Sequence, residues 1–205
     1  MKKESQVIFD KNVIEFVTVA AEFCAFLERA ESMKRSTFVD TTLKILPLLY
    51  LKASMLPKCE MIGDESPETY VTEEIYEVLR INLASILAEK DDYLEVFLPD
   101  MAYSDEPIKK NISEDLADIY QDIKDFIFVF QLGLNETMND SLAICQENFG
   151  LLWGQKLVNT MRALHDVKYS PKARGEDEEE EEYEPENNED CHCEDDDCHC
   201  HDHGC

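Results

Sequence analysis

Apolar side chains recur at steps of three and four residues along most of this 205-residue chain, and this spacing constrains the fold more than any other feature. Such a period places the apolar side chains on one side of an α-helix. It indicates helices over residues 7–32, 72–90, 113–130 and 139–168, and a further helix, apolar nearly all round, over residues 36–56. No segment reads persuasively as a strand, and glycines and prolines number only six and seven, which argues against an all-β design. The sequence therefore predicts an all-α bundle of about five helices.

The composition divides the chain into three parts. Residues 1–170 are expected to form the helical bundle, because every apolar stripe ends before Ser170. Residues 171–190 are mostly acidic and carry almost no apolar side chain. We expect them to be a disordered linker that is extended by self-repulsion. Residues 191–205 form a tail that is rich in Cys and His.

The segment over residues 36–56 is expected to be the central helix, because its apolar side chains leave almost no polar face. Pro47 lies inside it and is expected to kink the helix or split it in two, since proline lacks the amide hydrogen and its ring clashes with the preceding turn. A loop is expected after Leu56. A short helical turn that packs back on the bundle is expected within residues 91–107.

The fourth helix is expected to begin at Ser113, whose side chain suits the N-cap position. Four aspartates recur along this helix within an arc of about 80°. They are Asp115, Asp118, Asp122 and Asp125. Such a row could receive a cation or a basic partner, although a solvated helix face is the simpler interpretation.

Several residues of the other helices are expected to have structural roles. Cys24 and Cys145 lie on apolar stripes, where a free cysteine usually acts as a small buried residue. Gly150 and Gly154 are four residues apart and would let another helix approach closely, although each weakens the helix by about 1 kcal/mol relative to Ala. His165 is a lone histidine near a helix end, and a structural role is expected for it.

The charge of the chain disfavours several classes of partner. The formal net charge is −27, and sixteen of the acidic residues follow Gly175, where there is no Lys or Arg. An acidic surface repels phosphate groups, so neither nucleic acid nor an anionic membrane is expected as a partner. No secretory signal and no window of 18 uncharged apolar residues is found. We therefore expect a cytoplasmic protein with reduced thiols, whose partner is another protein.

Four segments carry a resemblance to a known family. They read DDYLEVFLPDM, ISEDLADIYQDIKDFIFVFQLG, ETMNDSLAICQENF and WGQKLVNTMRALH, and together they span most of residues 91–165. In these segments the chain resembles a bacterial family named only as domain of unknown function 5063. The resemblance implies a compact helical bundle from a bacterial cytoplasm, and it implies no activity.

The bundle lacks the motifs of the common enzyme classes. It has no Glu-x-x-His pair, no HExxH, no phosphate-binding loop and no GxGxxG, and no histidine precedes His165. The absence of an earlier histidine excludes a histidine-based catalytic triad in the helical core. The sequence favours a protein that is not an enzyme, and no cofactor is expected in the bundle.

The last fifteen residues, CHCEDDDCHCHDHGC, hold five of the eight cysteines and four of the five histidines. Thiolate and imidazole are the preferred ligands of Zn²⁺, and they also suit nickel and copper. The candidate metal ligands are Cys191, His192, Cys193, Cys198, His199, Cys200, His201, His203 and Cys205. The spacing matches no zinc finger, ribbon or knuckle. The composition is similar to the His/Cys-rich tails of bacterial nickel chaperones and to metallothionein-like sequences.

Two functions remain open after these observations. The first is a non-enzymatic protein whose tail binds a soft divalent metal (zinc, nickel or copper) and acts as a buffer or donor. The alternative is a helical module for protein–protein interaction or regulation, in which the tail is incidental. An enzyme that works in a pocket of the bundle is the least supported of the three.

Overall fold

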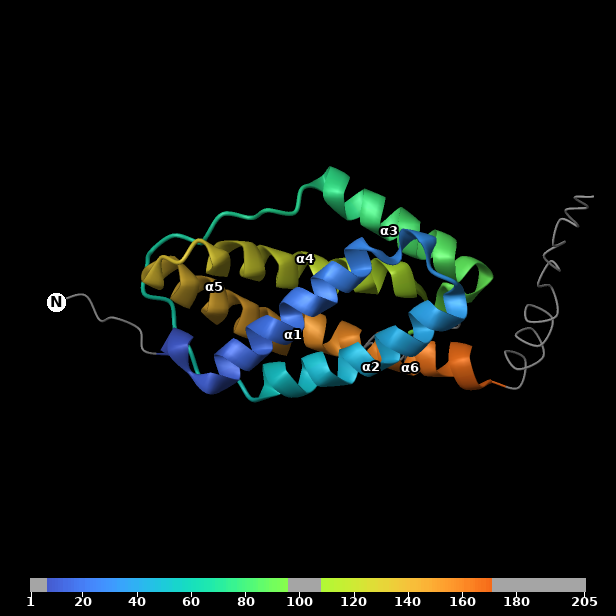
Figure 1. Cartoon of the computed structure of the whole chain (residues 1–205), viewed down its shortest axis with the longest axis horizontal. Helices are drawn as coiled ribbons and strands as arrows, with labels where there is room; N and C mark the ends of the chain where they lie inside the picture. Colours follow the sequence, from blue (N-terminus) through green and yellow to red (C-terminus); the bar gives the residue numbers. More distant parts are fainter. Residues whose placement is uncertain (1–6, 96–107, 171–205) are drawn as a thin grey trace, which may run out of the picture.

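The computed structural model of the chain describes residues 7–95 and 108–170. These residues form α1 (Lys11–Glu28), α2 (Arg35–Ser54), α3 (Glu73–Leu87), α4 (Ile112–Gln131), α5 (Asn135–Asn148), α6 (Gly154–Tyr169) and the strands β1 (Asp92–Leu94) and β2 (Lys109–Asn111). A π-helical turn, Phe149–Trp153, joins α5 to α6 without interruption, so that the two form one long rod (Figure 1). The prediction of an all-α bundle of about five helices is confirmed.

Helix α4 lies at the centre of the bundle, where it contacts α1, α3, α5 and α6 (Figure 1). The expectation that the helix over residues 36–56 is central is therefore wrong. That helix, α2, packs mainly against α1 and α6, and Leu48 and Leu51 remain 44% and 51% exposed. A helix with an apolar sequence is buried only where neighbouring elements pack around it. Of the helices that the structure describes, none has the length and apolar character needed to cross a membrane.

The proline was expected to kink or to split helix α2, and the split does not occur, because the helix continues through Pro47 without a break. Proline removes one backbone hydrogen bond from the helix interior. Leu46 and Leu49, on either side of Pro47, are fully buried in the core. Tertiary packing supplies most helical stability in a folded protein. Burial of these two side chains therefore keeps the segment helical across the proline.

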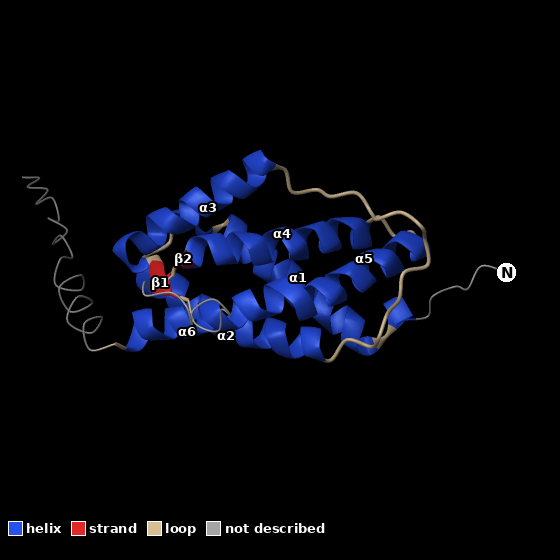
Figure 2. Cartoon of the chain, turned by 180° about the vertical axis from the view of Figure 1, so that it is seen from behind, coloured by secondary structure: helices blue, strands red, loops and turns tan. Residues whose placement is uncertain are grey.

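A small antiparallel hairpin lies beside the start of α4 (Figure 2). Its register pairs Asp92 with Asn111 and Leu94 with Lys109. Of the segment in which a helical turn was expected, residues 91–107, Asp92–Leu94 form a strand, while residues 96–107 lie outside the described part, so the turn stays a prediction there. Strands of three residues are too short to show the alternating pattern by which a strand is recognised.

The N-terminus of α4 is capped by a side chain that is distant in the sequence. The helix begins at Ile112, so Ser113 lies in its first turn, and the prediction of Ser113 as N-cap is wrong. Instead, Asp91 accepts hydrogen bonds from the Ser113 amide (2.7 Å) and the Ser113 hydroxyl (2.6 Å). A carboxylate at this position satisfies a free amide and interacts favourably with the helix dipole. The cap therefore comes from a residue 22 positions earlier in the chain.

Gly150, the first of the two glycines in the last rod, does not provide a close approach for another helix. Gly150 is exposed, with no atom within 4 Å of the place that a Cβ would take. At Gly154, a Cβ would lie 2.3 Å from the carbonyl oxygen of Phe149 in the same rod, and the Gly154 amide donates to that oxygen. A side chain at position 154 would therefore clash within the π-helical turn itself.

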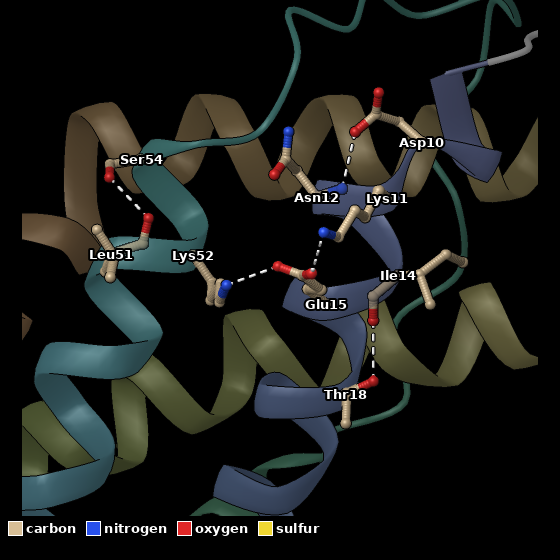
Figure 3. A network of polar contacts seen from close by, with 9 residues as sticks. All are labelled: Asp10, Lys11, Asn12, Ile14, Glu15, Thr18, Leu51, Lys52 and Ser54. Carbon is tan, nitrogen blue, oxygen red and sulfur yellow. Dashed lines mark hydrogen bonds and ion pairs between the residues drawn. The ribbon is translucent and has the colours of Figure 1, made fainter.

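Polar contacts at the start of α1 join it to α2 (Figure 3). Asp10 caps α1 by accepting a hydrogen bond from the Asn12 amide at 2.8 Å. Glu15 lies between two ammonium groups, at 2.6 Å from that of Lys52 on α2 and 3.5 Å from that of Lys11. The hydrogen bond from Lys52 lowers the pKa of the Glu15 carboxyl. This contact joins the two helices near the start of α1 and the end of α2.

Candidate functional site

The row of aspartates on α4 is not a solvated face, so the simpler interpretation of it is wrong. Asp115 is buried and accepts a hydrogen bond from the Tyr93 hydroxyl on β1. Burial raises the pKa of Asp115 to about 6. Asp118 accepts hydrogen bonds from the Tyr76 hydroxyl on α3 (2.8 Å) and from the ammonium group of Lys156 on α6. These two carboxylates therefore connect α4 to three neighbouring elements.

The other two aspartates of the row accept hydrogen bonds from neutral amides. Asp122 accepts one from the side-chain amide of Asn148 at 2.6 Å. Asp125 accepts two, from the backbone amides of Tyr70 (2.7 Å) and Val71 (2.8 Å), just before α3. Burial raises the pKa of both Asp122 and Asp125. Each carboxylate thus lies in a partly desolvated position and accepts its hydrogen bonds from uncharged donors.

Asp118, Asp122 and Asp125 line a cavity of about 400 Å³. We call it the α4–α5 cleft. One wall is α4, the opposite wall is α5 with the π-helical turn and the first turn of α6, and loop residues 67–69 form a third side. The volume lies within the usual range of small-molecule sites, about 300–1,000 Å³.

The cleft has an apolar surface as well as an acidic one. Its apolar lining includes Phe126, Val129, Ile144, Leu152 and Trp153. The acidic lining comprises the three aspartates and Glu68, while Lys156 supplies the ammonium group among the residues that line the cavity. An apolar pocket with a few convergent polar groups is the usual form of a ligand site.

The π-helical turn determines which side chains reach the cleft. It shifts the helical register, so that Leu152 lines the cleft and is 53% exposed, while Trp153 is fully buried. The indole N–H of Trp153 donates to the carbonyl oxygen of Cys145 at 3.1 Å. Such turns occur often at functional sites. A prediction based on the regular α-helical period cannot detect this shift of register.

The loop before α3 is attached to α5 by a carboxylate that the sequence did not single out. Asp140 accepts hydrogen bonds from the backbone amides of Ile62 (2.6 Å) and Gly63 (2.9 Å). A Cβ at Gly63 would lie 2.8 Å from an oxygen of Asp140. In the sequence, Asp140 lies 78 residues from Ile62 and 77 residues from Gly63. No local sequence pattern therefore predicts this contact.

Two of the three cysteines of the bundle are enclosed in the core, and the third, Cys59, is partly buried. Cys24 and Cys145 are 2% exposed, which confirms that they are small core residues. Burial raises the pKa of Cys24 to about 12 and also raises the pKa of Cys145. The Cys59 thiol lies 3.3 Å from the side-chain oxygen of Asn139 on α5. His165 is exposed at the surface of α6 and its ring lies 4.6 Å from that of Tyr169.

The nine candidate metal ligands of the tail, residues 191–205, lie outside the described residues, as does the acidic segment 171–190. The three-part division of the chain and the metal site therefore stay predictions. Within residues 7–95 and 108–170, no three His, Cys, Asp or Glu side chains are placed so that they could hold a metal ion.

Comparison with known proteins agrees with the fold. A family model described as a domain of unknown function, DUF5063, matches residues 7–170. The chain is also similar to a solved structure, the crystal structure of protein BF1032 from Bacteroides fragilis, a structural genomics target. The two are 93% identical, the match covers 82% of this chain and 99% of that chain, and the TM-score is 0.75. No curated protein matches the chain.

Proposed function

This chain belongs to the DUF5063 family, and we propose that it is a non-enzymatic metal-binding protein whose tail buffers or donates zinc, nickel or copper. The observation that carries the proposal is the density of soft ligands at the end of the sequence. Five thiols and four imidazoles fall within fifteen residues, beyond the family domain, which ends at residue 170.

The thiols of the bundle support an assignment of metal chemistry to the tail. The thiolate, not the thiol, is the metal ligand. Burial holds Cys24 and Cys145 in the protonated form, and their neighbours in the core are apolar side chains. Cys59 has its pKa raised by burial and lies against Asn139. Soft-metal binding by the whole chain is therefore expected to come from residues 191–205.

The spacing of the tail ligands allows more than one arrangement. Two Cys-x-Cys pairs, Cys191 with Cys193 and Cys198 with Cys200, could supply four thiolates to one tetrahedral ion. Four histidines and Cys205 remain for a second ion or for ligand exchange. The neighbouring acidic residues attract cations, while they also disfavour thiolate formation until metal arrives. Surplus ligands and an acidic environment suit a site that exchanges metal.

The alternative function, a module for protein–protein interaction or regulation, is favoured by exposed apolar side chains on the bundle. Leu48 and Leu51 on α2 and Leu151 in the π-helical turn are 44%, 51% and 71% exposed. Isolated exposed apolar residues are normal on protein surfaces, so this observation carries less weight than the composition of the tail.

Metal analysis of protein purified without an affinity tag tests the proposal. The full-length chain, a variant that ends at Gly175 and a variant with the five tail cysteines replaced by serine are each saturated with zinc and desalted. We expect more than one equivalent of zinc in the full-length chain and no tightly bound zinc in either variant. Equal zinc content in the full-length chain and the shortened variant would contradict the proposal and favour the interaction module.

A further inference from the structure

We propose that the α4–α5 cleft binds a small organic cation, an amine or a guanidinium group carried on an apolar body. This site lies in the bundle and is independent of the metal chemistry proposed for the tail. It follows from the cavity, from the placement of the carboxylates along one wall and from the apolar surface that faces them.

The carboxylates differ in how far their charges are compensated. Asp118 lies against the ammonium group of Lys156, and this ion pair neutralises one charge of the wall. Asp122 and Asp125 accept hydrogen bonds from the Asn148 side chain and from the backbone before α3. A neutral amide satisfies a lone pair of the carboxylate but does not neutralise its charge. Lys156 also attracts the Asp122 carboxylate, but it is the one ammonium group among the residues that line the cleft, against four carboxylates. The lining therefore retains negative charge that a bound cation would balance.

Desolvation strengthens this preference for a cation. Partial burial disfavours the ionised form of Asp122 and Asp125 and raises the pKa of each. An opposite charge within a few ångströms favours the ionised form. A neutral ligand would leave the carboxylates uncompensated, and an anion would add repulsion from the same wall.

The rest of the lining requires that the cation carry an apolar group. Phe126 and Val129 lie one turn and almost two turns beyond Asp122 on α4, and Ile144, Leu152 and Trp153 line the side formed by α5 and the π-helical turn. A bare metal ion cannot cover these side chains, and the described residues offer no cluster of three metal-binding side chains. An aromatic or aliphatic group attached to the cation would lie against this lining and cover Leu152, which is 53% exposed, while Phe126, Val129 and Trp153 are already buried.

A matched series of small molecules distinguishes charge from hydrophobicity. The probes are phenethylamine, its uncharged isostere 2-phenylethanol and the anion 3-phenylpropionate, each titrated into the full-length chain in the presence of EDTA. Binding is followed by calorimetry and by the fluorescence of Trp153, which is the only tryptophan of the sequence and lines the cleft. We expect saturable one-to-one binding of the amine with a fluorescence change, at least about tenfold weaker binding of the alcohol, and no binding of the anion.

Two variants locate the binding site. Asp122→Asn removes one charge and keeps an oxygen that can accept the hydrogen bond from Asn148, and it should weaken amine binding at least about tenfold. Glu114→Gln is the matched control, because Glu114 is exposed on the first turn of the same helix and outside the cleft. It should leave affinity within about twofold. The melting temperature of each variant shows whether the bundle is intact.

Several outcomes would overturn the proposal. It fails if the amine does not bind at millimolar concentration or if the alcohol binds equally well. Binding that is insensitive to Asp122→Asn also contradicts it, because such binding would come from general attraction to the acidic tail. Since that substitution removes a partly desolvated charge, loss of folding is not expected. If the variant does unfold, Asp125→Asn with the same titration provides the deciding measurement.

Discussion

The cysteines of this chain fall into two groups that differ in their surroundings. Cys24 and Cys145 lie in the helical core, Cys59 lies partly buried in the loop after α2, and burial raises the pKa of each of them. The five in the last fifteen residues alternate with histidines and acidic residues, and no Lys or Arg follows Arg174. The comparison teaches that the same side chain packs a core in one part of the protein, while in the other it stands in a sequence for which we propose ligand chemistry.

Acidic residues show the same contrast between the two parts. In the bundle, each of the four aspartates of α4 accepts a hydrogen bond from a residue on a neighbouring segment. In the tail, acidic residues follow one another without any basic residue between them. The bundle therefore uses its carboxylates to connect helices and to line a cleft, while those of the tail are expected to attract cations at long range.

The largest expected difference between the two groups of cysteines is their rate of reaction with a thiol reagent. Cys24 and Cys145 can react only when the core opens, whereas the tail thiols lie outside every predicted apolar stripe. We expect labelling of the two core thiols to be at least about a thousandfold slower, as measured by mass spectrometry of metal-free protein. Comparable rates would show that the core cysteines are not enclosed.

Stability is expected to depend on α4 and not on the tail. Leu116 is fully buried at the centre of the bundle, and Leu116→Ala should lower the free energy of unfolding by about 2–5 kcal/mol. A variant that ends at Gly175 should differ from the full-length chain by less than about 0.5 kcal/mol. Urea denaturation compares the three proteins, and a large effect of the truncation would break the division into bundle and tail.

The pH dependence of stability should report the buried carboxyl of Asp115. Its pKa is raised to about 6 in the folded state, against about 3.9 in an unfolded chain. Between these values the folded state binds more protons than the unfolded state, so the free energy of unfolding falls as pH rises through this window. In Asp115→Asn this fall between pH 4 and 7 should be smaller by about 2–3 kcal/mol.

Urea titrations at several pH values measure that difference. Glu114→Gln is the matched control, because Glu114 is the exposed neighbour of Asp115 in the first turn of α4. The control should retain the slope of the original chain. An unchanged slope in Asp115→Asn would contradict the raised pKa of this carboxyl.

The smallest expected effect concerns the two glycines of the last rod. A Cβ at Gly154 would meet the Phe149 carbonyl oxygen at 2.3 Å, whereas one at Gly150 meets nothing within 4 Å. Gly154→Ala should therefore lower the free energy of unfolding by about 1–3 kcal/mol. Gly150→Ala should be neutral or stabilising by up to about 1 kcal/mol. Equal effects would show that the π-helical turn does not depend on Gly154.

The helices could be predicted from the sequence because their signal is local. The stripe of Leu116, Ile119 and Ile123 identifies a helix without any knowledge of its neighbours. The position of each helix in the bundle could not be predicted in the same way. Helix α2 was expected at the centre because of its apolar composition, yet α4 is surrounded on more sides and α2 leaves Leu48 and Leu51 exposed.

The candidate cleft depends on contacts that connect distant parts of the sequence. The row from Asp115 to Asp125 was visible as a spacing, while its partners Tyr93, Asn148 and Tyr70 come from separate segments. The cap of α4 by Asp91 and the register shift of the π-helical turn are of the same kind. Such features require the folded arrangement and cannot be derived from local periodicity.

The most direct test of the account is whether metal binding is confined to the tail. Zinc is titrated into the full-length chain, and the melting temperature of the helices is followed by calorimetry at each step. The account predicts more than one bound equivalent and a change in melting temperature of less than about 2 °C, because a ligand stabilises only the part whose folding it is coupled to. A single tightly bound equivalent that raises the melting temperature by many degrees would show a structural site shared with the bundle and contradict the account.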